Sequence, residues 1–354
     1  MPVTITRQRN QVSENSPDAR AAALTSYPQV ALRLGLNPHE FMRRFGLDPA
    51  TLMNREQRIP FASLCHLLEA TAAESSTPSV GIQMAEARTA FDFGVIGVLL
   101  AHKRTLREVL NAMMHYRHLL NDALGLYVET TGSQVIVREE NLCDIGVWPR
   151  QTMELAVGVL VRTCGAVLGP DWRPASIHFT HAAPADLRVH SRIFGCPLVF
   201  ESEFNGFVCL ASDLDRLNPM ADPELVRYAE GLAESASAGG RQTISAEVRN
   251  AIYLLLPVEQ ATTEHVARHL HLSVRSLQRH LEDAETTFSN LLDEVRQELA
   301  VRYMSNERYP IGRVASLLGY TQQASFTQWF SRRFGMAPRT WRATRPSHPN
   351  TRAK

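Results

Sequence analysis

The strongest constraint on this chain is an internal repeat near its C-terminus. Four residues of the first copy recur 48 positions later, and two more recur 49 positions later. The matching residues are Val266 and Val314, Ala267 and Ala315, Leu270 and Leu318, Ser273 and Thr321, Leu277 and Phe326, and Leu281 and Phe330. Self-similarity of this kind indicates one supersecondary unit that is built twice.

Each copy predicts two short helices joined by a tight turn. In the first copy, Val266, Ala267 and Leu270 share one helix face, and the small Ala267 lets a second helix cross closely. Ser273 is suited to cap that second helix, because its hydroxyl can accept from a free backbone N–H. The outward face of the second helix then carries Arg275, Gln278 and Arg279. This is a helix-turn-helix unit, whose second helix enters the DNA major groove.

The second copy predicts the same design, with Thr321 as the cap. Its outward face carries Gln323, Thr327 and Gln328. Arginine pairs with guanine O6 and N7, and glutamine pairs with adenine N6 and N7. The alternative is that all these side chains are solvated positions on two ordinary helical hairpins. Two copies in register favour the DNA-reading interpretation.

A long helix is predicted between the two copies, over residues 288–304. Its 17 residues span roughly 25 Å. A helix of this length can hold two reading heads near the ~34 Å separation of successive major grooves. We interpret it as a scaffold.

Charge is distributed unevenly along the chain. From Arg241 onward there are 16 Lys and Arg against 10 Asp and Glu, a net charge of +6, whereas the preceding 240 residues carry 21 against 26, a net charge of −5. A basic C-terminal third indicates a polyanionic partner for that third.

The pattern predicts an α+β domain over residues 26–230, followed by an all-α domain over 244–345. In the first domain we expect helices at 60–74, 105–124 and 150–168, a β-hairpin around Gly132, and strands at 175–181, 197–201 and 206–211. Residues 1–25 are predicted to be a mobile arm, the Gly-, Ala- and Ser-rich stretch 231–243 a linker, and 346–354 a disordered tail.

Motifs for other classes of protein are absent from the sequence. No G-x-S-x-G, G-x-G-x-x-G, G-x-x-x-x-G-K-[ST] or H-E-x-x-H occurs, so we predict no catalytic residues and no cofactor. The five cysteines are scattered, which argues against a disulfide framework and a zinc site. His178 and His181 lie three apart on an expected strand and therefore make a poor metal chelate. The sequence contains no run of 18 apolar residues, so it predicts no membrane span.

Residues 243–345 resemble the DNA-binding domain of the AraC/XylS family of bacterial transcription regulators. The similarity lies in "VASLLGY" and "SFTQWFSRRFGMAPRTWR" of the second copy. By this resemblance the base-reading positions are Arg275, Gln278, Arg279, Gln323, Thr327 and Gln328, and the phosphate or cap positions are Ser273, Thr321, Arg332, Arg333 and Arg339. His271 and Glu285 stand where glycine is usual, and Tyr320 stands where phenylalanine is usual.

The N-terminal domain resembles that of the AraC subgroup called arabinose-binding-like. The resemblance implies effector sensing and dimerisation, but we do not predict arabinose as the ligand. Tyr116, Trp148, Arg150 and Trp172 could line a pocket for an anionic effector, although packing explains them equally well. The helix at 115–122 is a candidate dimer contact.

The sequence thus predicts a sequence-specific transcription regulator, most simply an activator. Its expected partners are promoter double-stranded DNA, RNA polymerase, a small-molecule effector and a second copy, and its expected location is the bacterial cytoplasm, at the nucleoid. The alternative is a small-molecule-binding or catalytic protein whose C-terminal helices only mediate protein contacts.

Overall fold

The computed structural model describes residues 17–88, 90–142, 149–237, 243–270, 272–306 and 309–344. The chain divides into two compact units, Met1–Gly240 and Arg241–Lys354. Their boundary lies inside the predicted linker. Each unit is treated by itself below.

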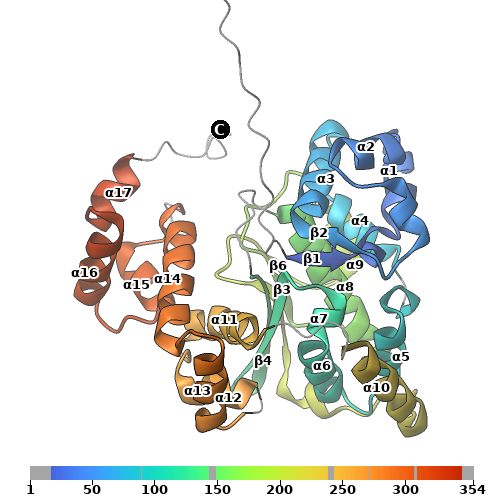
Figure 1. The fold of residues 1–354 in the computed structure, drawn as a ribbon. Coiled ribbons are helices and arrows are strands. Elements are labelled where there is room, and N and C mark those ends of the chain that lie inside the picture. The colour runs from blue at the N-terminus through green and yellow to red at the C-terminus, as the bar shows by residue number, and fades with distance from the viewer. Residues whose placement is uncertain are drawn as a thin grey trace, which may run out of the picture. The chain divides into compact units, whose positions relative to one another are not determined.

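Ten helices are described in the N-terminal unit (Figure 1). They are α1 (Tyr27–Arg33), α2 (Pro38–Arg44), α3 (Phe61–Glu74), α4 (Val80–Glu86), α5 (Val95–His102), α6 (Leu106–His115), α7 (Arg117–Leu120), α8 (Arg150–Leu168), α9 (Arg188–Phe194) and α10 (Pro223–Ser237). Short 3-10 turns add η1 (Ala21–Leu24), η2 (Pro49–Met53), η3 (Ala90–Phe93) and η4 (Ala211–Asp215). The predicted helix 105–124 is divided at Tyr116 into α6 and α7.

Two sheets complete the described part of this unit. The strands β1 (Asp18–Arg20) and β2 (Arg58–Pro60) form an antiparallel pair, and the five-stranded sheet has the order β3-β4-β7-β5-β6. Its strands are β3 (Leu124–Thr131), β4 (Gln134–Asn141), β5 (Ser176–His178), β6 (Leu198–Val199) and β7 (Asn205–Leu210). Only β5 and β6 pair in parallel within it. The predicted α+β class and the hairpin are therefore confirmed.

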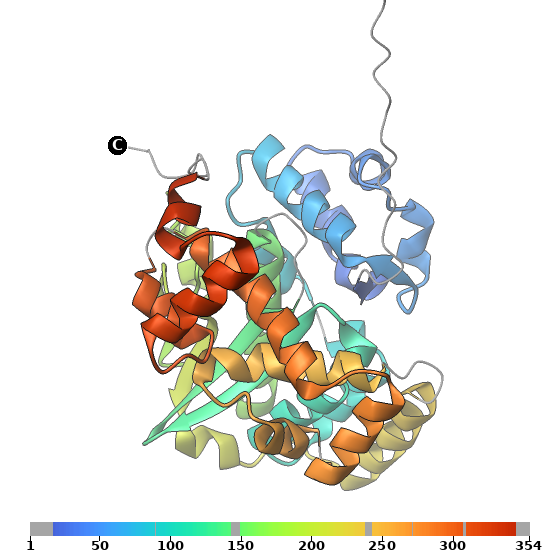
Figure 2. The ribbon, with the colours of Figure 1, turned by 60° about the vertical axis from the view of Figure 1, so that its left-hand side comes forward.

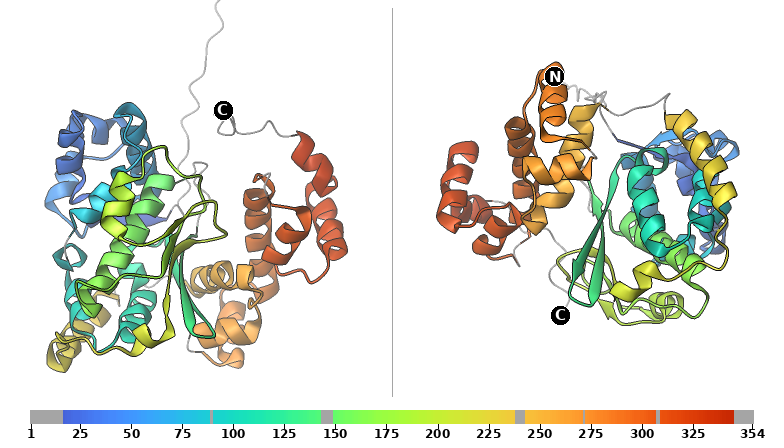
Figure 3. Two further views of the ribbon diagram at one scale, coloured as in Figure 1. Left: turned by 180° about the vertical axis from the view of Figure 1, so that it is seen from behind. Right: turned by 90° about the horizontal axis from the view of Figure 1, so that it is seen from below.

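The helix α8 is the centre of the N-terminal unit. It packs on α3 and α4 on one side and on β4 and β7 of the sheet on another (Figure 3). Gly158 is necessary at the crossing with α4, because a Cβ there would lie 2.7 Å from the Cβ of Ala85. By length and composition α8 is also apolar enough to cross a membrane, but 72% of it is buried inside the protein. Such burial is typical of a core helix.

Two boundary predictions are wrong. Residues 18–24, assigned to a mobile arm, form β1 and η1, because Ala19 and Leu24 are completely buried in the core beneath α3. Residues 231–237, assigned to the linker, belong to α10, where Ala229 and Ala233 pack on α5. Alanine is the strongest helix former, so an Ala-rich segment with little apolar bulk still forms a helix. Residues 1–16 and the predicted tail lie outside the described residues.

The C-terminal unit is helical throughout its described residues, as predicted. It contains α11 (Ile244–Leu255), η5 (Leu256–Val258), α12 (Thr263–His269), α13 (Val274–Asp283), α14 (Phe288–Met304), α15 (Ile311–Leu317), α16 (Gln323–Phe334) and α17 (Pro338–Thr344). Figure 2 shows α14 running from the α12–α13 pair to the α15–α16 pair. The 17-residue helix predicted between the two copies is therefore present as α14.

Candidate functional site

The first copy of the repeat folds into the helix-turn-helix pair α12–α13. Val266 and Ala267 of α12 and Leu277 and Leu281 of α13 are buried, and the two helices are in contact. Ser273 caps α13, because its Oγ accepts from the backbone N–H of Ser276 at 3.0 Å. The buried face of each helix is the one that the apolar spacing in the sequence predicts.

The exposed face of α13 carries the three side chains predicted to read bases. Arg275, Gln278 and Arg279 are all exposed, and no hydrogen bond joins them to another described residue. They project away from the buried Leu277, on successive turns of one helix. This arrangement can present two guanidinium groups and one amide to the edges of bases.

The second copy folds into α15–α16 with the same internal packing. Phe326 and Phe330 of α16 are fully buried, as are Val314 and Leu318. Gln323 and Gln328 are exposed, and Thr327 is half-buried, with its hydroxyl donating to the carbonyl of Gln323 at 2.9 Å. The prediction that Thr321 caps this helix is wrong. The N-cap is Gln322, without a side-chain hydrogen bond, because α16 begins one residue later than α13 does in its copy.

Equivalent hydrogen bonds close the two turns. The N–H of Leu272 donates to the carbonyl of Ala267 at 2.8 Å, and 48 residues later that of Tyr320 donates to Ala315 at 2.9 Å. Gly319 takes a φ of +71° in the second turn. Its counterpart, His271, lies outside the described residues. The backbone thus repeats the duplication that the side chains indicate.

Polar contacts join the second helix pair, α15–α16, to α14. Trp329 donates from Nε1 to Asp293 Oδ1 at 2.7 Å, and the Arg296 guanidinium lies 4.6 Å from the centre of the Tyr320 ring. Arg333 Nε donates to Gln297 Oε1 at 2.8 Å. Asp293, Arg296 and Gln297 share one face of α14 by their spacing. These contacts join α14 directly to the second helix pair, α15–α16.

Arg332, Arg333 and Arg339 give the second head an exposed basic surface. All three are exposed. Arg333 has the internal partner Gln297, whereas Arg332 and Arg339 make no hydrogen bond with another described residue. These positions suit contacts to phosphate oxygens, which carry no sequence information.

The corner after α13 has a strained backbone at Glu285. Its φ is +54°, in the left-handed region that side chains with a Cβ adopt at a cost. The sequence had singled out this residue, because it stands where the resembled family has glycine. The chain makes the turn all the same, with the Glu285 N–H donating to the carbonyl of Glu282 at 3.0 Å.

The four residues considered for an effector pocket do not come together in the N-terminal unit. Trp172 is buried and donates from Nε1 to Asp213 Oδ2 at 3.1 Å. Arg150 is bound to Glu154 and to the carbonyl of Pro78, at 3.0 and 2.8 Å. Tyr116 is buried between α6 and α7, and Trp148 lies outside the described residues. The packing alternative therefore holds for the three that are described.

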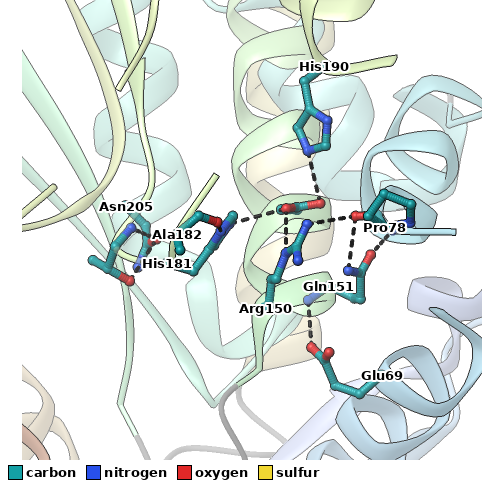
Figure 4. Close-up of polar contacts among 11 residues, drawn as sticks. Glu69, Pro78, Arg150, Gln151, His181, Ala182, His190 and Asn205 are labelled. Atoms are coloured by element: carbon teal, nitrogen blue, oxygen red, sulfur yellow. Dashed lines mark hydrogen bonds and ion pairs between the residues drawn. The ribbon is translucent and has the colours of Figure 1, made fainter. Parts of the chain in front are cut away.

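A charged cluster surrounds the buried Glu154 near the start of α8 (Figure 4). Its carboxylate lies 3.1 Å from His181 Nε2, 3.2 Å from His190 Nε2 and 3.0 Å from Arg150 Nε. Burial by itself raises the pKa of Glu154, but the two imidazoles and the positive Arg150 outweigh it and lower the pKa to about 2. The cluster ties α8 to α9 and to the segment after β5.

The start of α8 is held by polar groups as well. Glu69 Oε1 accepts from the backbone N–H of Gln151 at 2.6 Å, and Gln151 Oε1 accepts from the N–H of Gly81 at 3.0 Å (Figure 4). Burial raises the pKa of Glu69 to about 7. Within the described residues, no group of three or more His, Cys, Asp or Glu side chains has the geometry of a metal site. We interpret these contacts as structural.

Comparison with protein families gives two matches. The family described as the arabinose-binding domain of AraC transcription regulators, N-terminal, matches residues 35–218. The family described as a helix-turn-helix domain matches residues 266–344. The first match covers more than half of the chain, and the second covers both reading heads.

Individual proteins are similar over nearly the whole length. The HTH-type transcriptional regulator VirS of Mycobacterium tuberculosis H37Rv is 29% identical over 326 residues, which cover 92% of this chain and 96% of VirS. The ornithine utilization regulator of Pseudomonas aeruginosa is 24% identical over 335 residues, 94% of this chain and 98% of that protein. The crystal structure of the transcriptional regulator CdpR from Pseudomonas aeruginosa aligns over 89% of this chain and 98% of its own, with 22% identity and a TM-score of 0.39.

Proposed function

Because this chain belongs to the AraC family of transcription regulators, we propose that it activates transcription from a promoter that its two helix-turn-helix heads read together. The carrying observation is the duplicated unit with equivalent turns, each copy exposing Arg or Gln at the start of its second helix. We propose Arg275, Gln278 and Arg279 as base-reading in the first head, and Gln323, Thr327 and Gln328 in the second. Arg332, Arg333 and Arg339 would contact phosphates, as would Ser273, the N-cap of α13, and Thr321, two residues before α16.

The N-terminal unit would sense a small molecule and pass the signal by shifting the population of DNA-binding states. RNA polymerase would be the partner at the promoter, and the protein would act in the bacterial cytoplasm, at the nucleoid. No catalytic activity is part of this proposal. The family resemblance and the absence of enzyme motifs from the sequence support it.

A second copy of the chain would bind the exposed face of α10. Leu225, Tyr228 and Leu232 lie on this face, where they are 40%, 68% and 45% exposed. Three large apolar side chains at this spacing are unusual on a surface that only meets water. The candidate dimer helix of the sequence, residues 115–122, packs beside α10 through His118 and Ser237. Leu232→Glu should convert the dimer to a monomer in analytical ultracentrifugation, and an unchanged mass would contradict this interface.

A salt titration tests the DNA-reading function against the alternative of protein contacts only. DNA fragments that the protein selects from a random pool serve as the probe. A reader that neutralises ~6 phosphates should show log K falling with log[salt] at a slope near −5. A flat response, or no selection of any sequence, would favour helices that bind only proteins.

A further inference from the structure

The N-terminal unit contains a cavity of about 120 Å³ at the junction of its two hydrophobic cores. Most of its wall is apolar. Leu64 and Leu155 come from the core around α3, and Leu126 and Leu160 come from the core beneath the sheet. Arg20, Arg88 and Glu139 also line the cavity, although they are far apart in the sequence. None of the three polar residues was predicted to be a site residue from the sequence.

Each of those three polar residues has a buried atom without a hydrogen-bond partner among the described residues. The atoms are Arg20 Nε, Arg88 Nε and Glu139 Oε2. Folded proteins satisfy nearly all buried polar groups, so three such atoms around one cavity require an explanation. One explanation is a bound molecule that supplies the missing hydrogen-bond partners. Two of the three atoms are donors, and all three residues line the same cavity.

Glu139 lies on the apolar face of its strand, whereas a carboxylate usually lies on the face that meets solvent. Side chains alternate along β4, so Glu139 shares a face with the buried Val135 and Val137. Burial raises the pKa of Glu139 to about 8, and no basic group acts against that shift. At neutral pH the side chain is therefore largely a carboxylic acid, which can donate a hydrogen bond.

The arginine end of the cavity is positive. Arg88 binds the carbonyl of Ala22, and Arg20 binds Glu56 and donates to the carbonyl of Phe93 at 3.2 Å. Asp92 also lines the cavity. Its Oδ1 lies 3.3 Å from Arg55 Nη1, and its charge also acts on Arg88. Burial lowers the pKa of Arg88 to about 10, and Arg88 is still charged at neutral pH. An anion is the complement of this end.

We propose that this cavity binds the effector, and that the effector is a small organic acid. Its carboxylate would accept hydrogen bonds from Arg88 and Arg20, its apolar body would lie along Leu155, and a polar atom at its far end would accept from Glu139. The volume is near that of an engineered cavity that holds benzene, so the body is one ring or a short chain. This inference rests on the proposed sensing function and names its ligand class.

The test uses the full-length protein and pairs of acids and amides of equal shape. Benzoate and hexanoate are compared with benzamide and hexanamide by isothermal titration calorimetry and by thermal unfolding. We expect the acids to bind and to raise the melting temperature, and the amides to bind about tenfold or more weakly, because a hydrogen bond to a charged group is lost. Hexylamine serves as the cationic probe and should not bind.

Two variants place the site. Arg88→Met should weaken benzoate binding about tenfold or more, whereas Arg188→Met, which removes an exposed arginine of α9, should leave it unchanged. Ala156→Leu fills the cavity from α8 and retains every charge. It should abolish binding with an equal or higher melting temperature, and it keeps the test decisive if Arg88→Met does not fold.

The outcomes separate this inference from the proposed function. Equal binding of acids and amides, a preference for hexylamine, no binding of either acid, or full benzoate binding by Ala156→Leu would overturn the cavity assignment while DNA binding stays intact. Benzoate binding that leaves affinity for the selected DNA unchanged would overturn the sensing role. Benzoate binding by a protein that selects no DNA would instead refute the proposed function and leave the cavity assignment in place.

Discussion

Arg279 is the residue whose role in DNA reading can be tested most directly. It is exposed on α13, one turn after Arg275, and belongs to the helix expected in the major groove. Arg279→Ala should cost ~1–3 kcal/mol of binding free energy at one base pair and relax the preference there. Competition between the selected site and its single-base variants measures this.

Arg339→Ala is the matched control for that substitution. Arg339 is also exposed, but it is expected to contact a phosphate. Its loss should weaken binding to all sequences alike and reduce the salt slope by about 1. If Arg279→Ala behaves in the same uniform way, Arg279 does not read a base.

Glu285 carries backbone strain that a single substitution can relieve. Its φ of +54° costs glycine nothing, so Glu285→Gly should stabilise the C-terminal unit by about 0.5–1 kcal/mol. The measurement is the midpoint of the thermal transition of that unit. Glu282→Gly is the control. It also removes one glutamate carboxylate, but it places glycine within α13, and it should therefore destabilise the C-terminal unit by about 1 kcal/mol. An unchanged midpoint for Glu285→Gly would remove the strain argument.

At the scale of the element, α8 carries one fully buried carboxylate, Glu154. The folded-state pKa of Glu154, about 2, lies below its usual 4.5. Its contribution to stability, roughly 3 kcal/mol, is therefore present above pH 4.5 and is lost as the pH falls towards 2. In Glu154→Gln, this loss of folding stability between pH 4.5 and 2 should be absent.

Glu154→Gln should also be less stable at neutral pH, by roughly 3 kcal/mol, because the half-buried Arg150 then loses its anionic partner. Urea unfolding at a series of pH values measures both effects. Glu74→Gln, which removes an exposed partner of Arg44, is the control and should change little. Parallel pH profiles for wild type and Glu154→Gln would show that the cluster does not stabilise α8.

Across the whole molecule, the two compact units should produce two unfolding transitions. Leu110 is buried in the core of the N-terminal unit, and Phe330 is buried in that of the C-terminal unit. Leu110→Ala should lower only one calorimetric transition, by about 2–5 kcal/mol in stability, and Phe330→Ala only the other, by about 3–5 kcal/mol. Differential scanning calorimetry of the full-length variants measures this. A single transition that both substitutions shift would show that the units unfold together.

Local pattern determined much of this protein. The apolar spacing of the repeat fixed both helix pairs, the bounds 150–168 of α8 follow from its periodicity, and the hairpin follows from alternation around Gly132. These features depend on neighbours in the chain, which the sequence displays. The family resemblance added the functional interpretation of the exposed positions.

Tertiary contacts alone decided the rest. Residues 18–24 and 231–237 are mostly polar or small, and they are ordered because distant apolar surfaces cover Ala19, Leu24 and Ala233. The cavity brings together Arg20, Arg88 and Glu139 from three remote segments, and no spacing along the chain encodes such a meeting. Only the alternation of Val135, Val137 and Glu139 gave a local signal, a carboxyl group on an apolar face. What that carboxyl faces depends on packing, because burial and charge compensation are properties of the folded chain.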